Sequence, residues 1–116
     1  TAAEFDKLFT TDKPVIFNFH GYAGLIKQLF FDRENHNLKV FGYKEQGTIT
    51  TSFDMSVRNN IDRCHLAMEI AASVKLAPAT KAKIKREMNA ILNKHEEYIR
   101  ENNTDLPEIE NCKWGE

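Results

Sequence analysis

Two short apolar segments on either side of a helix-period segment constrain the fold more than any other feature of the sequence. The first runs from Val15 to Phe19 and the second from Leu38 to Tyr43, and both are rich in β-branched and aromatic residues. Between them, Tyr22 to Phe31 repeats apolar residues at helical spacing. A connection of about 18 residues allows a helical crossover, which joins parallel strands. The alternation predicts an α/β layered fold with a parallel sheet.

Further helices are predicted on either side of this unit. Apolar residues share one side of residues 2–9, and a longer stripe runs from residue 54 to about residue 75, with Ser52 or Asp54 as its cap. Another helix starts at Pro78, a residue suited to a first helical turn, and stops at Asn102 and Asn103. Its apolar stripe consists of Ile84, Met88, Ile91, His95 and Tyr98. We expect the tail, residues 104–116, to lie extended over the surface.

Composition and charge place the chain among globular single domains. Its 116 residues fit one domain, 41% are hydrophobic, and 16 Lys and Arg against 17 Asp and Glu leave a net charge of -1. This balance predicts no nucleic-acid partner, and apolar runs shorter than about 18 residues predict no membrane span. Cys64 and Cys112 lie far apart and are not accompanied by Cys or His residues at the spacing of a zinc site. We therefore expect no metal site, a buried thiol at Cys64 and a cytoplasmic location.

A first candidate site follows the first predicted strand. His20, Gly21 and Tyr22 come directly after Phe19, at the carboxyl edge where open parallel sheets usually bind ligands. Gly21 allows a tight turn, and an imidazole can act as an acid, a base or a donor to phosphate. No nucleophile motif accompanies these residues. A structural role for His20 is therefore favoured over a catalytic one.

A second candidate is the loop after the second strand, residues 42–52. Its sequence, GYKEQGTITTS, offers one ammonium group and several hydroxyl and backbone donors, a chemistry suited to phosphate, but it lacks the ending of a P-loop. The loop is expected to contact a neighbouring domain or to bind an anion, unless its threonines only cap the next helix. The residues available for such a contact are Tyr43, Lys44, Thr48, Thr50 and Thr51.

Charged residues on the two long helices are interpreted as solvated surface. Asp62, Arg63 and His65 form a charged trio, yet neighbouring residues on a helix point in different directions, so local ion pairs are expected. Lys83 and Glu87 have the spacing of an ion pair one turn apart. Neither group predicts a catalytic set.

Three stretches carry a family resemblance that goes beyond composition. They are TTDKPVIFNFHGY at residues 10–22, FGYKEQGTITTSFDM at residues 41–55 and NNIDRCHLAMEI at residues 59–70. Together they resemble the C-terminal region of phosphoketolases, and the resemblance covers nearly all of the chain. One departure is Ala23-Gly24, where a common form of the family has Pro-Trp. This difference leaves the substrate preference open.

The resemblance implies an enzyme related to transketolase that splits xylulose 5-phosphate or fructose 6-phosphate with inorganic phosphate. The products are acetyl phosphate and an aldose phosphate. The implied cofactor is thiamine diphosphate with a divalent metal, Mg²⁺ or Ca²⁺, bound by the earlier domains at a subunit interface. No catalytic, cofactor-binding or metal-binding residue carries over to this chain, because none of its matching positions belongs to the family's cofactor motif.

For residues 1–116 themselves, the resemblance implies a three-layer α/β/α domain like the transketolase C-terminal domain. Its expected role is to support a homo-oligomer, at least a dimer, together with the other domains of the enzyme, and regulation stays open. Two strands are few for a sheet, so a strand before Thr1 is expected to complete it. The alternative is a free-standing α/β module that binds a phosphorylated metabolite through His20 and the Lys44 loop. A start at Thr1 instead of Met favours the domain of a longer chain.

Overall fold

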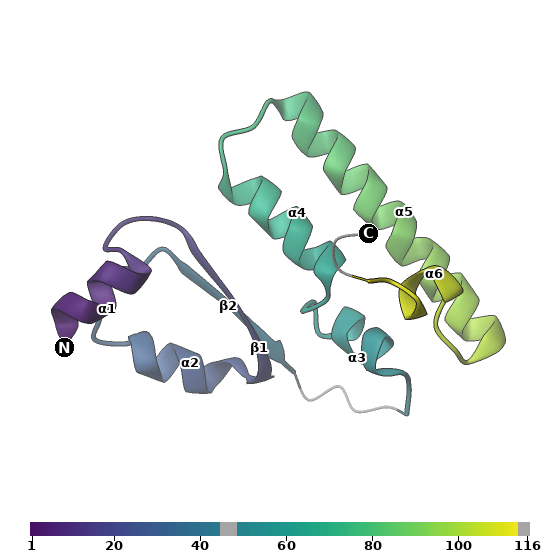
Figure 1. Ribbon diagram of the computed structural model, residues 1–116, viewed down its shortest axis with the longest axis horizontal. Coiled ribbons are helices and arrows are strands. Elements are labelled where there is room, and N and C mark those ends of the chain that lie inside the picture. Colours follow the sequence, from purple (N-terminus) through teal and green to yellow (C-terminus); the bar gives the residue numbers. More distant parts are fainter. Residues whose placement is uncertain (45–48, 114–116) are drawn as a thin grey trace.

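The sheet consists of two parallel strands joined by a helix. The computed structural model describes residues 1–44 and 49–113. Strand β1 (Val15–Tyr22) lies beside β2 (Leu38–Tyr43), and α2 (Ala23–Phe30) makes the crossover between them (Figure 1). The pairing begins with Val15 opposite Leu38. The predicted α/β class and parallel sheet are confirmed, and within the described residues the sheet has these two strands alone.

Aromatic side chains close one face of the sheet. Helix α1 (Ala2–Phe9) meets α2 there, and the rings of Phe5 and Phe9 lie 4.9 and 5.0 Å from the ring of Phe30, centroid to centroid. Phe17 of β1 joins the cluster at 6.4 Å from Phe30. Edge-on aromatic pairs of this kind add to the stabilisation that comes from burying apolar area. The aromatic cluster, Phe5, Phe9, Phe17 and Phe30, therefore holds α1, β1 and α2 together.

The opposite face of the sheet meets α4 (Arg63–Ser73). Successive side chains of a strand point to opposite faces, so Asn18 points away from the aromatic cluster. Its amide donates to the carbonyl of Ile61 at 2.9 Å. Lys39 of β2 forms an ion pair with Glu69 of α4. Helices thus lie on both faces of the sheet, which confirms the predicted three-layer α/β/α arrangement in a small form.

The single helix expected from residue 54 to about residue 75 is wrong, because the chain forms two helices there. The first is α3 (Ser52–Arg58), and its cap is Thr51 instead of the expected Ser52 or Asp54. After α3, Asn60 adopts a φ of 59°, a left-handed conformation that Asn tolerates better than most residues. Helix α4 begins beyond this break. Apolar spacing continues across the break, so periodicity did not reveal it.

Helix α5 (Pro78–Asn102) runs back along α4 to form a hairpin (Figure 1). It starts at Pro78, as predicted, and its cap Asn103 has a left-handed φ of 55°. Although α5 has 25 residues, neither it nor any other helix of the described part is long and apolar enough to cross a membrane. The expectation of an extended tail is wrong at α6 (Pro107–Glu110), where buried Ile109 anchors a short helix. Trp114 lies outside the described residues.

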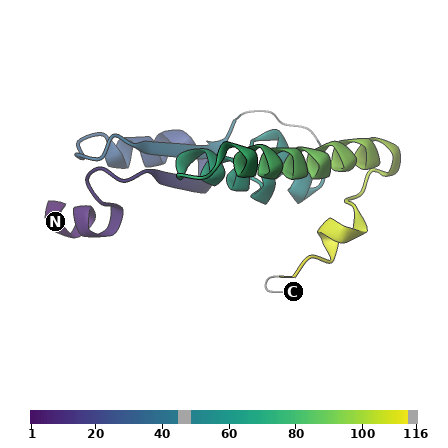
Figure 2. The ribbon, with the colours of Figure 1, turned by 90° about the horizontal axis from the view of Figure 1, so that it is seen from above.

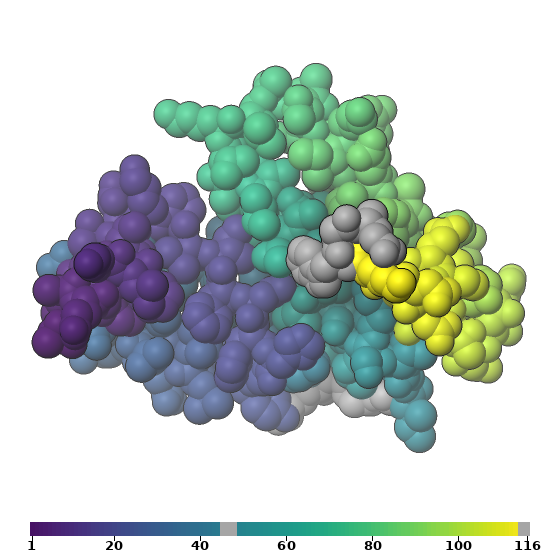
Figure 3. Space-filling model, in the orientation of Figure 1, coloured from purple at the N-terminus to yellow at the C-terminus, as the bar shows by residue number. Residues whose placement is uncertain are grey.

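The domain is flat, and its core is small. The extents are 50 × 36 × 24 Å, and the radius of gyration is 16.5 Å (Figure 2), whereas a compact domain of this length has about 13 Å. The surface is hollowed between the N-terminal part and the α4–α5 hairpin (Figure 3). The groove there is lined by Pro14, Ile16, Leu66, Ile70, Ser73 and Val74. The buried hydrophobic residues of the described part are Phe30, Ile61, Cys64, Ala71, Leu106 and Ile109.

Candidate functional site

Three of the candidate residues lie within β1 and not beyond its end. The strand was expected to stop at Phe19, but it continues through His20, Gly21 and Tyr22. Pairing with β2 resumes at Tyr22 opposite Tyr43, after an irregularity in the register. The sequence could not show this extension, since the partner strand holds the last residues in place. Gly21, which would allow a tight turn, lies within the strand instead.

The carboxyl edge of the sheet brings His20 and Tyr43 together. The His20 Nδ1 lies 3.1 Å from the Tyr43 hydroxyl oxygen, and the two rings meet edge to face at 5.9 Å. Which atom donates depends on the imidazole tautomer. His20 is exposed, and so is Tyr22. His20 and Tyr43 thus lie side by side at this edge, and the imidazole faces solvent.

The two glycines of this edge allow close packing of the chain. A Cβ at Gly42 would collide with the Gly21 carbonyl oxygen and would lie 2.7 Å from the Ala23 nitrogen. A Cβ at Gly21 would lie 2.6 Å from a ring carbon of Phe19, a side chain that has some freedom to move. Gly42 is thus required by the backbone around it.

Lys44 is positioned by its backbone. Its N–H donates to the Asn59 Oδ1 at 2.6 Å, and the Asn59 side chain, 1% exposed, also donates to the Met55 carbonyl at 2.9 Å. Asn59 therefore ties the end of β2 to α3. The Lys44 side chain is exposed, and Lys44 directly follows Tyr43 in the sequence. It is available to an anion or to a neighbouring surface.

The threonines of the loop do not share this edge. The Thr50 hydroxyl donates to Asp54 at 2.7 Å, and the Thr51 hydroxyl donates to Asp105 at 2.6 Å. Thr51 also accepts from the Asp54 N–H at 3.1 Å, as a helix cap does. Capping and tail anchoring account for both residues. Thr48 lies outside the described residues.

A buried polar cluster around Asp54 was missed by sequence reasoning. The Asp54 carboxylate is 3.0 Å from the His95 Nε2 and accepts from the Arg58 Nε at 2.6 Å, in addition to the Thr50 hydroxyl. His95 is 1% exposed and Asp54 is 4% exposed. Burial acts to raise the pKa of Asp54, but the hydrogen bonds from Thr50, Arg58 and His95 outweigh it and lower that pKa. The Asp54 cluster joins α3 to α5.

His95 fills a position that the sequence placed on the apolar stripe of its helix. Its ring packs edge to face on Phe53 at 5.0 Å, with the Arg63 guanidinium 5.6 Å from the same Phe ring. The His95 Nδ1 is buried and has no hydrogen-bond partner among the described residues. A histidine on an apolar stripe was the only available signal, and it does not identify its partner. The partner is 41 residues away along the chain.

The interpretation of Asp62 as part of a solvated face is wrong. Asp62 is 4% exposed and caps α4, accepting from the Cys64 N–H at 2.8 Å and the His65 N–H at 3.2 Å. It also contacts the His65 imidazole. The Asn-Asn-Ile-Asp segment at residues 59–62 could have indicated this helix start, because Asp is a preferred cap. Lys83 and Glu87 form the predicted ion pair at 3.9 Å.

The described residues do not fit a site for thiamine diphosphate and its metal. No group of three or more His, Cys, Asp or Glu in residues 1–44 and 49–113 is placed to hold a metal ion. The buried carboxylate of Asp54 is already bound to Thr50, Arg58 and His95. The buried carboxylate of Asp62 caps α4 and contacts His65. Among the described residues, the carboxyl edge presents His20, Tyr43 and Lys44. These three side chains cannot surround a diphosphate. What this edge can do is contact one anionic or polar group.

Comparisons with known proteins match the chain over almost its whole length. The family model of the XFP C-terminal domain matches residues 1–114. The chain is 54% identical over 112 residues to probable phosphoketolase 2 of Lactiplantibacillus plantarum, which covers 97% of the chain and 14% of that protein. It is 51% identical over 111 residues to the probable phosphoketolase of Pediococcus pentosaceus, which covers 96% of the chain and 14% of that protein.

A third relative is similar to the same degree. The chain is 50% identical over 112 residues to the xylulose-5-phosphate phosphoketolase of Lactiplantibacillus pentosus, covering 97% of the chain and 14% of that protein. The chain thus spans 14% of the length of these curated relatives. With the family model matched from residue 1 to residue 114, the chain belongs to the XFP C-terminal domain family, the C-terminal domain of phosphoketolases.

Proposed function

We propose that the chain is the non-catalytic C-terminal domain of a phosphoketolase. The complete enzyme cleaves xylulose 5-phosphate or fructose 6-phosphate with inorganic phosphate, and it releases acetyl phosphate and an aldose phosphate. Thiamine diphosphate and its divalent metal supply the carbanion chemistry and are held by the other domains. This domain supports the assembly, a homo-oligomer in the cytoplasm. The identity of about half the residues to named phosphoketolases supports the proposal.

One observation favours this reading over a free-standing metabolite-binding module. The chain exposes 8598 Å² of surface, whereas a compact monomer of 13.4 kDa exposes about 6,500 Å². The excess of roughly 2,000 Å² is the size of surface that permanent interfaces bury. A free-standing module leaves this additional surface exposed to solvent. A domain packed against the rest of an enzyme buries it.

The exposed apolar residues indicate where such contacts lie. On α2 and just before it, Tyr22, Leu25 and Leu29 are 58%, 61% and 60% exposed, at spacings of three and four that put them on one side. On α4, Ile70 and Val74 are 46% and 43% exposed and line the groove beside Ile16 of β1. The first surface suits a neighbouring domain. The groove lies against β1 and suits the further strand expected before Thr1.

Two measurements test the proposed function. Calorimetric titration of thiamine diphosphate with Mg²⁺ into the 116-residue chain is expected to give no micromolar binding, and the chain alone is expected to release no acetyl phosphate from xylulose 5-phosphate. The complete enzyme is expected to bind thiamine diphosphate and to release acetyl phosphate. Micromolar cofactor binding by the isolated chain would overturn the non-catalytic assignment, and a complete protein without phosphate-dependent cleavage would overturn the reaction.

The contact role of the Lys44 loop has its own test. Replacing Lys44 and Thr48 with Ala is expected to lower the activity or dimer stability of the complete enzyme and to leave the melting temperature of the chain nearly unchanged. The control is Lys83→Ala, which removes an exposed cation on α5. A large loss of stability in the chain itself would assign the loop to folding.

A further inference from the structure

An apolar hollow of about 400 Å³ lies between β2, α4 and α5. Phe41 comes from β2, and Leu66 and Met68 come from α4, so its walls are mostly apolar. Pockets for small molecules typically have about 300 to 1,000 Å³ and combine apolar walls with a few polar groups. Neither His20 nor Tyr43 lines the hollow, so it is a separate feature from the carboxyl edge.

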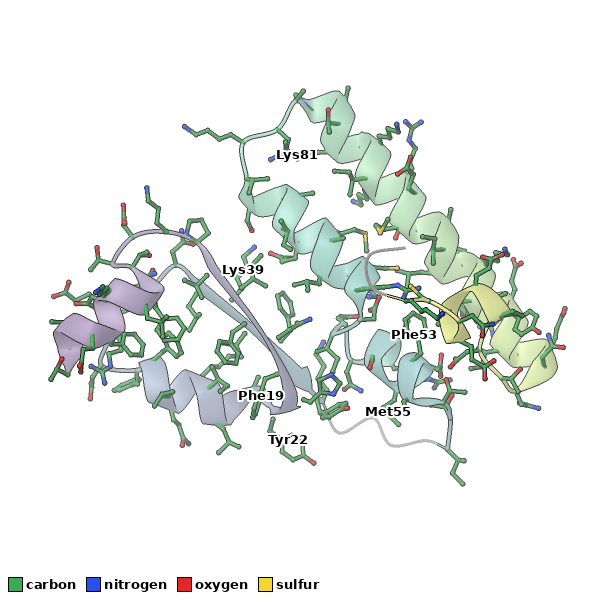
Figure 4. The ribbon with its side chains drawn as sticks, in the orientation of Figure 1. Phe19, Tyr22, Lys39, Phe53, Met55 and Lys81 are labelled. Carbon is green, nitrogen blue, oxygen red and sulfur yellow. The ribbon has the colours of Figure 1, made fainter. Side chains whose placement is uncertain are left out.

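Two lysines of α5, Lys81 and Lys85, line the same hollow. They are one helical turn apart and share a face. In the described part of the chain neither forms an ion pair, whereas Lys83 pairs with Glu87 and Lys39 pairs with Glu69. Figure 4 shows Lys81 in the gap between α4 and α5, with Lys39 reaching toward α4 from the sheet. Two cations without an ion-pair partner in the described residues thus line the hollow.

The positions of these lysines are electrostatically unfavourable in an empty hollow. Like charges one turn apart on a helix repel each other. The carboxylate on the lining, Glu69, is already paired with Lys39. The hollow therefore has an excess of positive charge over an apolar floor.

We propose that this hollow binds a small organic anion. A phosphate or carboxylate group lies between Lys81 and Lys85, and a short apolar body packs on Phe41, Leu66 and Met68. The anion relieves the repulsion between the two ammonium groups, and the apolar body removes exposed hydrophobic surface from water. The proposal does not depend on the proposed function, because every residue in it belongs to this chain.

The test separates charge from apolar contact by using three probes. Phenyl phosphate carries both groups, inorganic phosphate carries only the charge, and phenol carries only the ring. Each is titrated into the isotope-labelled 116-residue chain and followed by two-dimensional NMR of the backbone amides. Phenyl phosphate is expected to bind saturably and at least about tenfold more tightly than either other probe, since each contact adds free energy. The shifted amides should lie in α4 and in the first half of α5.

Matched variants assign the binding to the lysines. The double variant Lys81→Ala, Lys85→Ala is expected to weaken phenyl phosphate binding about tenfold or more, a loss in the range of charge-assisted hydrogen bonds. Lys83→Ala, which removes a cation from between these positions in sequence, is expected to leave it unchanged. Equal weakening by both variants, or shifts confined to the His20–Tyr43 edge, would overturn the site, as would no saturable binding.

The outcome does not depend on the chain folding by itself. A dispersed amide spectrum shows at the start that it is folded. If the spectrum is collapsed, the same variants are compared in the complete enzyme by the rise in melting temperature that phenyl phosphate causes. A smaller rise for the Lys81 and Lys85 double variant than for Lys83→Ala supports the site. Equal rises exclude it, because binding elsewhere in the enzyme is common to both variants.

Discussion

In each half of this domain a different kind of interaction holds the helices and strands together. In the first half, α1, β1 and α2 meet on the aromatic cluster of Phe5, Phe9, Phe17 and Phe30. In the second half, α3 and α5 meet on the Asp54 cluster, where Arg58 and His95 bond to one carboxylate. Apolar packing tolerates changes that keep volume, whereas a buried charge depends on each partner. The second half should therefore be the more sensitive to single substitutions of polar atoms.

The largest expected effect is the loss of the buried carboxylate. Asp54→Ala leaves His95 without its partner and removes a hydrogen-bond acceptor from Thr50 and Arg58, so the free energy of unfolding should fall by about 4 kcal/mol. Urea denaturation measures it. Glu96→Ala is the control, because Glu96 forms an exposed pair with Arg100 at 2.5 Å, and such pairs contribute less than about 1 kcal/mol. Similar losses for both variants would contradict the comparison.

Removing the centre of the aromatic cluster should have a slightly smaller effect. Phe30 is 6% exposed, and Phe30→Ala should lower the free energy of unfolding by about 3 kcal/mol through lost burial and the cavity left behind. Phe31→Ala is a matched control one residue away, since Phe31 is 81% exposed. It should change stability by less than about 0.5 kcal/mol. If Phe31→Ala is as costly as Phe30→Ala, the packing described for the first half is wrong.

Completing the sheet should stabilise the first half by a further amount. The outer edge of β1 has no partner strand in the described residues, and unpaired edges pair readily with other chains. The 116-residue chain should therefore associate as its concentration rises, and extension upstream of Thr1 should raise its melting temperature. Light scattering over a concentration series and thermal unfolding measure both effects. A strictly monomeric chain that gains no stability from the extension excludes the missing strand.

The smallest expected effect is the dependence of stability on pH. It is also the sharpest test of the difference between the two halves. Burial acts to raise the pKa of Asp54, yet hydrogen bonds hold that pKa below its ordinary 3.8. A lowered folded-state pKa means that the stabilisation is present above the unfolded-state value and is lost as pH falls through the folded-state value. The stability gap between wild type and Asp54→Asn should therefore narrow as the pH falls below about 3.8.

The aromatic half provides the reference for that measurement. Phe30→Ala removes no titrating group, so its stability gap from wild type should stay flat across the same acid range. Chemical denaturation at each pH gives both gaps. A gap for Asp54→Asn that stays flat would show that the carboxylate is not stabilised by its partners in the folded state.

The sequence was a good guide to the elements and a poorer one to the contacts. Residue periodicity predicted the strand positions and the crossover, and Pro78 and Asn103 marked the ends of α5, because these signals are local. The break at Asn60 was missed because the apolar spacing continued through it. Of the candidate residues, His20 and Tyr43 lie together at the carboxyl edge of the sheet, while Thr50 and Thr51 bind Asp54 and Asp105.

By itself the sequence determined the α/β class, the parallel pair of strands and the family. These depend on periodicity and on long matching stretches, which are properties of the chain in order. Only the tertiary structure decided that Asp54 meets His95, that Asp62 is buried, and that Lys81 and Lys85 line a hollow with Phe41. Such contacts join residues far apart in the chain, and their partners are fixed by how helices and strands pack, which no local pattern encodes.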